Sequence, residues 1–314
     1  MVTVIIIIND FGEVIMIQRS TLLLFILFIA SFGAYSAQIQ AIELEHDNGT
    51  LVIAKTPSRI VVLAFSFVDA LAIADVSPVG IADDGDINKL IPSVRSRIGT
   101  WHSVGSRYQP SLEAISSLKP DLIIADSGRH QSIYNDLMAI APTLMFKSQG
   151  VTYRENLQII QKIAKAINKV DLVKSRLEEH SQLMGRLKAK FKSNDTFQFA
   201  VISDKGMWVH SPHSYAGSVI AELGLNSPID SKNKNAYIST GFEQFIKLNP
   251  DWLFVGKYTN RTVLDKWKES PLWKLLKINK SKQLISVPIN EWSLASGVLS
   301  AEKIALEIES QIQP

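Results

Sequence analysis

The pattern of apolar and polar residues occurs twice in distant parts of the chain. Residues 112–125 and 242–255 each carry apolar residues at helical spacing, then a Pro-Asp pair, then an unbroken apolar run. Proline cannot continue a helix, and a short apolar run is typical of a buried parallel strand. The copies align with Glu113 on Glu243, an offset of 243 − 113 = 130 positions. We therefore predict two similar α/β lobes, although Leu-x-Pro-Asp is also simply a common way to end a helix.

Other segments of the first half fit the same alternation of strands and helices. Asn-Gly at 48–49 between alternating segments is the strongest short signal of a hairpin. Strands alternating with helices predict a parallel sheet. The expected strands are residues 59–63, 78–82 and 144–146, and the expected helices are 67–75, capped by Ser66, and 133–140.

Residues 153–192 differ from both halves, because they hold no proline and repeat apolar residues at mostly three- to five-residue intervals. They predict one long helix, or two in close succession, connecting the lobes; two ordinary surface helices are the alternative. In the second lobe we expect strands at 197–202 and 284–287 and helices at 217–223, 267–277 and 301–312. The predicted fold is α/β: two Rossmann-like lobes with parallel sheets (residues 38–152 and 193–314) joined by a long connecting helix (residues 153–192).

The N-terminus has the pattern of a secretory signal peptide. Arg19 precedes the apolar residues 22–30, and small residues follow to Ala37. We expect cleavage after Ser36 or Ala37, and export to the periplasm. An uncleaved membrane anchor is the alternative, but the apolar run is short of the roughly 20 residues that span a bilayer.

The first fifteen residues fit export poorly, because Asp10 and Glu13 are acidic and no basic residue accompanies them. We interpret Met16 as the start of translation, so that residues 1–37 comprise a signal peptide with a misassigned upstream start.

Composition excludes several kinds of site. The chain has no cysteine, so it has no disulfide, thiolate metal site or cysteine nucleophile. Its formal charge is only +3 and no Lys/Arg run marks nucleic-acid binding. No phosphate-binding glycine loop or G-x-S-x-G is present. His210 and His213 are separated by Pro212, which predicts a loop with two exposed histidines rather than a zinc pair. We expect no enzyme activity, no protein-bound metal and no cofactor.

Candidate ligand contacts follow the predicted strands, because ligands of open α/β sheets bind beyond the carboxyl ends of strands. Arg107, Arg129 and Arg154 would suit a carboxylate-rich ligand, since a guanidinium matches carboxylate geometry. Each arginine taken alone is more simply an ordinary surface residue. The predicted contacts in a cleft between the lobes are Phe65, Ser66, Trp101, Arg107, Ser127, Arg129, Lys147, Arg154, Trp208, Tyr215 and Trp292.

The chain resembles the iron-siderophore periplasmic binding proteins. The resemblance covers nearly all of the mature chain and is carried most strongly by residues 59–63, 67–72, 79–84, 103–107 and 110–127. It implies a class III periplasmic binding fold, and a monomer that captures ferric citrate or a similar ferric hydroxycarboxylate and delivers it to an inner-membrane ABC importer. The chelate would supply the ligands of iron.

The resemblance also implies a docking role for Glu113 and Glu243, since relatives present one glutamate per lobe to the permease. The alternative is two solvated carboxylates that the helix dipole favours.

Two departures from the family pattern leave the chelate open. Residues 203–205 read Ser-Asp-Lys where relatives carry arginine, and Leu294 and Ser296 stand where relatives carry further arginines. Another siderophore, haem or cobalamin is the alternative within the same fold. A two-lobed α/β enzyme such as a glycosyltransferase is the alternative outside it.

Overall fold

The computed structural model describes residues 4–8, 14–18, 41–230 and 232–312. The chain divides into two units, residues 1–40 and 41–314. In the first unit, β1 (Val4–Ile8) pairs antiparallel with β2 (Val14–Gln18). The predicted apolar core of the signal peptide and both candidate cleavage sites lie outside the described residues.

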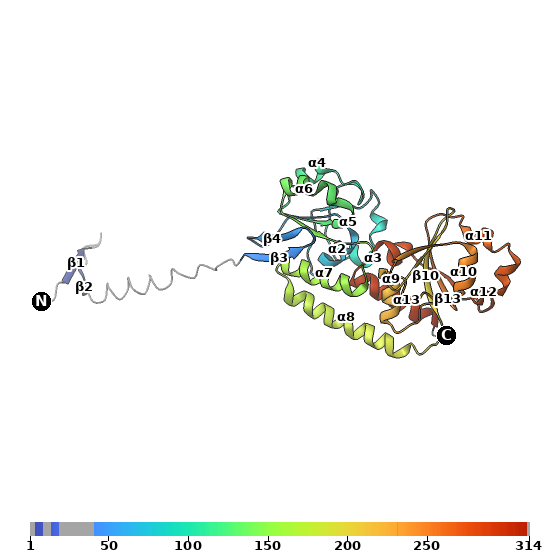
Figure 1. Cartoon of the computed structure of the whole chain (residues 1–314). Coiled ribbons are helices and arrows are strands. Elements are labelled where there is room, and N and C mark those ends of the chain that lie inside the picture. The colour runs from blue at the N-terminus through green and yellow to red at the C-terminus, as the bar shows by residue number, and fades with distance from the viewer. Residues whose placement is uncertain (1–3, 9–13, 19–40, 231, 313–314) are drawn as a thin grey trace. The chain divides into compact units, whose positions relative to one another are not determined.

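The second unit contains two five-stranded sheets (Figure 1). The first sheet is parallel throughout, in the spatial order β7 (His102–Ser103), β6 (Gly80–Ile81), β5 (Ile60–Val62), β8 (Leu122–Asp126) and β9 (Thr143–Phe146). The second has the order β12 (Tyr237–Thr240), β11 (Met207–His210), β10 (Phe197–Ile202), β13 (Trp252–Lys257) and β14 (Leu284–Ser286). Its β10, β13 and β14 are parallel, whereas β11 and β12 run antiparallel to their neighbours. The two predicted α/β lobes are therefore confirmed, and the antiparallel pair is an addition to them.

Helices cover the two sheets. The first lobe contains α2 (Phe65–Ala72), η1 (Ile87–Lys89), α3 (Pro92–Arg95), α4 (Leu112–Ser117), α5 (Ser127–His130), η2 (Gln131–Ile133) and α6 (Tyr134–Ile140). The second contains α9 (Tyr215–Glu222), α10 (Phe242–Leu248), α11 (Val263–Trp267), η3 (Pro271–Leu275), α12 (Lys277–Lys280), the π turn η4 (Asn290–Leu294) and α13 (Val298–Ile312). The predicted Asn-Gly hairpin is confirmed as β3 (Ile42–His46) and β4 (Gly49–Ile53).

Two helix predictions were wrong in detail. Ser66 does not cap a helix, because α2 already begins at Phe65 and Ser66 is buried within its first turn. Residues 267–277 are not one helix: α11 ends at Trp267, and Pro271 starts the separate 3₁₀ turn η3. Proline lacks the N–H that a continuous helix would need there.

The connection between the lobes is helical, as predicted, and takes the two-helix form. Helix α7 (Tyr153–Ala166) begins with a capping box of Thr152 and Glu155. Helix α8 (Val170–Lys190) follows after a break at Asn168, whose φ of 54° ends the first helix. Helix α7 packs on α2, and α8 packs on α13 while it returns toward the second lobe (Figure 1). Two packed helices leave few loop residues to absorb motion between the lobes.

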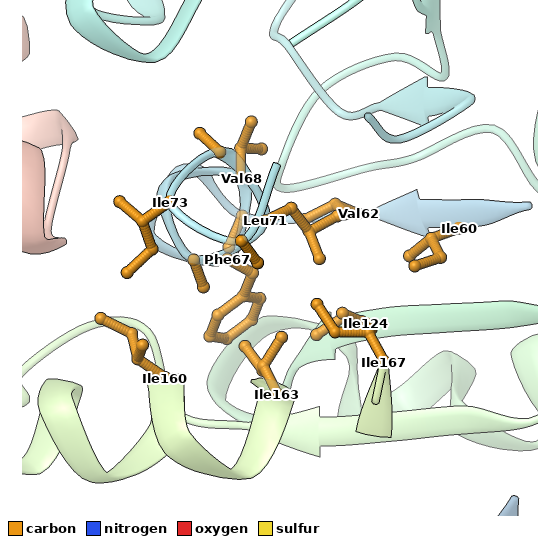
Figure 2. Packing of buried hydrophobic residues seen from close by; sticks show 14 of the residues in the cluster. Ile60, Val62, Phe67, Val68, Leu71, Ile73, Ile124, Ile160, Ile163 and Ile167 are labelled. Atoms are coloured by element: carbon orange, nitrogen blue, oxygen red, sulfur yellow. The ribbon is translucent and has the colours of Figure 1, made fainter. Parts of the chain in front are cut away.

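One of the two hydrophobic clusters of the first lobe lies between its sheet and the helices α2 and α7, and the other includes Ile115 of α4 and Leu137 of α6. Figure 2 shows Phe67 and Leu71 of α2 beside Val62 and Ile124 of the sheet, with Ile163 of α7 close below. All five side chains are at most 1% exposed. Burying a side chain of this size contributes about 1.5–3 kcal/mol, so this packing fixes where α2 and α7 begin relative to the sheet.

The two Pro-Asp turns make equivalent anchors. Asp121 accepts hydrogen bonds from the backbone N–H groups of Ser58 (2.9 Å) and Arg59 (2.7 Å), just before β5. Asp251 accepts from the backbone N–H (2.9 Å) and the hydroxyl (2.7 Å) of Thr196, just before β10. Each aspartate therefore fixes the entry of the central strand of its lobe, which explains why both copies keep Pro-Asp.

A buried carboxylate joins the first lobe to the closing helix. Asp69 of α2 is fully buried and accepts a hydrogen bond from the backbone N–H of Leu299 (3.1 Å), in the first turn of α13. Gly297 lies so close that a side chain at this position would collide with the carboxylate. Since α13 packs on α8 and α9, this bond ties the first lobe to the second.

Asp69 gives the protein a specific dependence of stability on pH. Burial raises the pKa of Asp69 to about 7, whereas an aspartate in an unfolded chain titrates near about 4. Between these values the folded protein holds a proton that the unfolded chain lacks, so the free energy of unfolding falls as the pH rises from about 4 to about 7. Asp69→Asn keeps an acceptor oxygen and should lose this part of the slope in urea unfolding.

The control is Asp136→Asn, which changes an exposed aspartate of α6 and should keep the slope of the parent protein. Parallel curves for the parent protein and Asp69→Asn across this pH range would contradict the assignment.

Candidate functional site

A cavity of about 640 Å³ opens between the two lobes. Most of its wall follows the carboxyl ends of parallel strands, where ligands of α/β sheets bind. The first lobe contributes Ala64, Phe65, Ser66, Arg107, Tyr108, Arg129, Ser148 and Gln149. The second contributes Val201, Ser203, Asp204, Lys205, Trp208, His210, Tyr237, Tyr258, Thr259, Ser293, Leu294 and Ser296.

Arg107 is held in place by a carboxylate and an aromatic ring. Its Nε and Nη2 donate to one oxygen of Asp84 at 3.0 and 2.7 Å, and its backbone N–H donates to the other oxygen. The guanidinium carbon lies 4.0 Å from the ring centre of Phe65. Burial works against the charge of Asp84, but the hydrogen bonds from Arg107 outweigh it and lower the pKa of Asp84 to about 2. The pair is therefore ionised at neutral pH, and Nη1 of Arg107 has no bond within the described part of the chain.

Arg129 repeats this arrangement. Its Nη1 donates to the buried Asp126 and to the hydroxyl of Ser148 (2.9 Å), and the guanidinium carbon lies 4.9 Å from the ring centre of Tyr108. Its Nε is buried and has no partner in the structure. This atom has almost no accessible surface, so the part of the guanidinium that can meet a ligand is Nη2, which has no bond among the described residues.

His130 links the two arginine segments. Its Nδ1 accepts from the backbone N–H of Asp126 (3.0 Å), so the proton resides on Nε2, which donates to the carbonyl oxygen of Arg107 (2.9 Å). Burial lowers the pKa of His130, which keeps the ring neutral in this arrangement. One buried ring therefore joins the backbone of Arg107 to the segment that carries Arg129.

The wall of the second lobe is aromatic rather than cationic. The His210 ring lies edge-on to Tyr237, with 4.8 Å between ring centres, and Trp208 lies two residues away on β11. Burial lowers the pKa of His210 to about 3, so the imidazole is neutral, and its Nδ1 has no partner. The Tyr237 hydroxyl accepts from the backbone N–H of Gly150 in the first lobe (3.3 Å).

Five of the predicted contacts line the cavity: Phe65, Ser66, Arg107, Arg129 and Trp208. The hydroxyl oxygen of Ser66 is buried and has no partner there. These side chains come from three segments of the first lobe and one of the second, so the fold brings together residues up to 143 positions apart (208 − 65 = 143).

Three predicted polar contacts lie outside the cavity. Arg154 is exposed and forms an ion pair with Glu222 of α9 (2.9 Å). The hydroxyl of Ser127 donates to Asp47 in the β3–β4 turn (2.6 Å). Lys147 is exposed just after β9 and contributes no atom to the wall. The sequence indicated the correct strand ends but not the direction in which each side chain leaves the backbone.

Three predicted aromatic contacts also lie elsewhere. Trp101 donates its indole N–H to Asp83 (3.1 Å) and packs on the first core. Tyr215 is buried, and its hydroxyl donates to the carbonyl oxygen of Gly297. Trp292 is 1% exposed in the core of the second lobe, because the π turn η4 directs it inward.

Sequence analysis missed several residues of the wall. Tyr237 and His210 lie on β12 and β11, the antiparallel pair that no predicted strand covered. The predicted exposed loop was therefore wrong for His210, which is 6% exposed. Tyr108 and Ser148 directly follow the predicted contacts Arg107 and Lys147. Including the next residue after each predicted contact would have found both.

Glu113 and Glu243 occupy equivalent places. Each is the second residue of its helix, α4 or α10, and each is exposed. Across the described residues, neither carboxylate has a hydrogen bond or ion pair, so both are available to a partner.

The described residues were compared with the requirements of a membrane-spanning helix and of a metal site, and they meet neither. None of their helices has the length and apolar character needed to cross a membrane. No cluster of three or more His, Cys, Asp or Glu side chains among them could hold a metal ion.

The profile of the periplasmic binding protein family matches residues 82–290. The chain belongs to this family. It is 41% identical to the Fe(3+) dicitrate-binding periplasmic protein FecB of Escherichia coli, over 85% of this chain and 89% of that protein. It is 38% identical to the Fe(3+)-citrate-binding protein YfmC of Bacillus subtilis, over 86% of this chain and 85% of that protein. These likenesses agree with the resemblance found in the sequence.

The fold is that of solved siderophore-binding proteins. SirA of Staphylococcus aureus, crystallised with staphyloferrin B, superposes with a TM-score of 0.76 at 24% identity, over 86% of this chain and 98% of SirA. The petrobactin-binding protein YclQ of Bacillus subtilis gives 0.75 at 22% identity, over 88% of this chain and 99% of YclQ. At this identity the likeness establishes the fold alone.

Proposed function

We propose that this periplasmic binding protein captures ferric citrate, or a similar ferric hydroxycarboxylate, and delivers it to an inner-membrane ABC importer. One observation carries the proposal. Two arginines, Arg107 and Arg129, are held by carboxylates on one wall of the cavity between the lobes, and Nη1 of Arg107 and Nη2 of Arg129 have no bond among the described residues. The likeness to two ferric-citrate-binding proteins supports the choice of ligand.

The free polar groups of the wall match a carboxylate-rich chelate. Guanidinium N–H groups bind carboxylates through strong charge-assisted hydrogen bonds. Citrate oxygens would satisfy Fe³⁺, a hard cation, so the protein needs to recognise only the outside of the complex.

The second wall favours a ligand that is not anionic on every side. Ser203, Leu294 and Ser296, which are not cationic, line the cavity together with the aromatic residues Trp208, Tyr237 and Tyr258. A bulkier hydroxycarboxylate chelate with an apolar flank fits this wall as well as ferric citrate does. Haem and cobalamin also have apolar flanks, but they present fewer carboxylates to the arginine pair.

Ferric citrate should quench the fluorescence of Trp208, which lines the cavity. We expect saturable quenching in the purified protein, and at least about tenfold weaker binding in Arg107→Gln or Arg129→Gln, because each loses charge-assisted hydrogen bonds. Lys55→Gln, at an exposed site of the first lobe, is the matched control and should bind like the parent protein. The same titration with iron-free citrate shows whether binding requires the metal. Absence of any response at saturating ferric citrate, by fluorescence and by calorimetry, would reject this ligand.

Substitution of two aspartates, Asp84 and Asp204, should have opposite effects on ligand affinity. Asp84 orients Arg107, and ordering a free arginine costs up to about 2 kcal/mol, so Asp84→Asn should weaken binding about tenfold. Asp204 lines the cavity and is exposed, so Asp204→Asn should tighten the binding of an anion a few-fold. Calorimetric titration of both variants measures this. Tighter binding in both variants would mean that charge alone decides and that Asp84 has no orienting role.

Charge reversal tests the docking role. Glu113→Arg and Glu243→Arg should each reduce the uptake of radioactive ferric citrate by cells that depend on this protein, and the double variant should abolish it. Binding to the purified protein should remain unchanged, because both residues are exposed on helices remote from the cavity wall. Glu179→Arg, at an exposed position of α8, is the control. Normal uptake by the double variant would remove the proposed role from both glutamates.

A further inference from the structure

The second lobe carries a segment that combines lysines with exposed leucines. Residues 266–282 contain six lysines and one acid, Glu269, so the segment has a formal charge of 6 − 1 = +5. All six lysines are exposed. Only Lys277 has an ion pair among the described residues, with Asp251 (2.9 Å). This lysine–leucine segment carries more than the net charge of the whole chain, which is +3.

The leucines are exposed because η3 is a 3₁₀ turn. Residues three apart lie on the same face of a 3₁₀ helix. Trp273 and Leu276 are therefore buried in the core, at 5% and 2% exposure, while Leu272 and Leu275 share the outer face at 48% and 63%. Lys274 lies between these leucines in the sequence. Two leucines on one exposed face of a lysine-rich segment are not explained by the core of the lobe.

The lysine–leucine segment adjoins the proposed docking helix. The Trp267 ring stacks on Phe242 and Phe245 of α10, with 5.2 and 5.8 Å between ring centres. Phe242 immediately precedes Glu243 in the sequence. Helices α10, α11 and α12 therefore form one end of the second lobe (Figure 1).

We propose that the lysine–leucine segment binds the surface of an anionic phospholipid membrane. Lysines near an anionic leaflet are attracted to lipid phosphates, and exposed leucines enter the boundary between headgroups and acyl chains. An acidic protein surface would use the lysines but would leave the leucines in water. The nearness of α10 supports this choice, because a carboxylate that meets a membrane permease must itself come close to the lipid surface.

The proposed contact is weak and reversible. Each lysine near an anionic leaflet changes the partition coefficient by about fivefold at low salt, and the effect decreases as the ionic strength rises. Such a contact would confine the protein to the membrane surface between encounters with the permease. It does not depend on which chelate fills the cleft, so it stands or falls separately from the proposed ligand.

The test is sedimentation of the exported protein with vesicles. The protein is recovered from the periplasm, and its N-terminus is identified by mass spectrometry. It is then mixed with vesicles of phosphatidylglycerol and phosphatidylcholine, or of phosphatidylcholine alone. We expect partition onto the anionic vesicles only, about 30-fold weaker in Lys274→Gln/Lys280→Gln and about tenfold weaker in Leu272→Ser/Leu275→Ser. All proteins share one N-terminus, so its contribution cancels.

Two controls make the result specific. Lys55→Gln/Lys192→Gln removes the same charge at exposed sites outside the segment and should bind vesicles like the parent protein. Unchanged circular dichroism and thermal unfolding show that each variant is folded.

Three outcomes would overturn the proposal. These are no enrichment on anionic vesicles, equal loss in the control pair, or lysine-dependent binding that the leucine variant keeps and polyglutamate competes away. The last outcome would assign the segment to an acidic protein instead.

Discussion

The cleft depends on the pairing of buried positive charge with buried negative charge. A guanidinium that is less than one-tenth exposed needs a carboxylate, because desolvation of a single charge costs several kcal/mol. Asp84 and Asp126 supply these carboxylates next to strand ends, and they use only part of each arginine. The remaining N–H groups are fixed in direction before a ligand arrives, so the ligand does not have to order them. The cleft thus offers a ligand donors that are already oriented, in addition to net charge.

The two lobes of the second unit share the same structural features. Each lobe fixes its central strand with the aspartate of a Pro-Asp turn, and each presents one exposed glutamate on the helix before that turn. The lobes are then held together by α7 and α8, and by the buried bond from Asp69 to the start of α13. A rigid frame of this kind suits a binding protein that holds its ligand between two lobes.

The sequence predicted most of the fold, because strong local signals decide it. The repeated Pro-Asp pattern, the Asn-Gly hairpin and the apolar strand runs all appear where expected. The helix predicted for residues 267–277 is interrupted, because Pro271 cannot continue it and starts a separate 3₁₀ turn. The β11–β12 pair was missed because β11 is short and is shared between core and cleft, so its residues do not alternate cleanly.

The cleft was harder to predict than the fold. A strand end can be located from the apolar run before it, which is how Arg129 was found, whereas Arg107 was found just upstream of the first repeated helix. Whether the next side chain enters the cavity depends on tertiary partners such as Glu222 for Arg154, which local sequence does not reveal. Trp292 has the residue type of a cavity wall, but the backbone of η4 turns it into the core.

His130 has a consequence for selectivity. A single neutral imidazole bridges the backbone beside both arginines, so the two segments that carry them are coupled. Such coupling would favour a chelate that has two carboxylates at a matching separation. Two ferric complexes of equal charge would be distinguished by their shape, so an isomer with its carboxylates splayed differently would be left in solution.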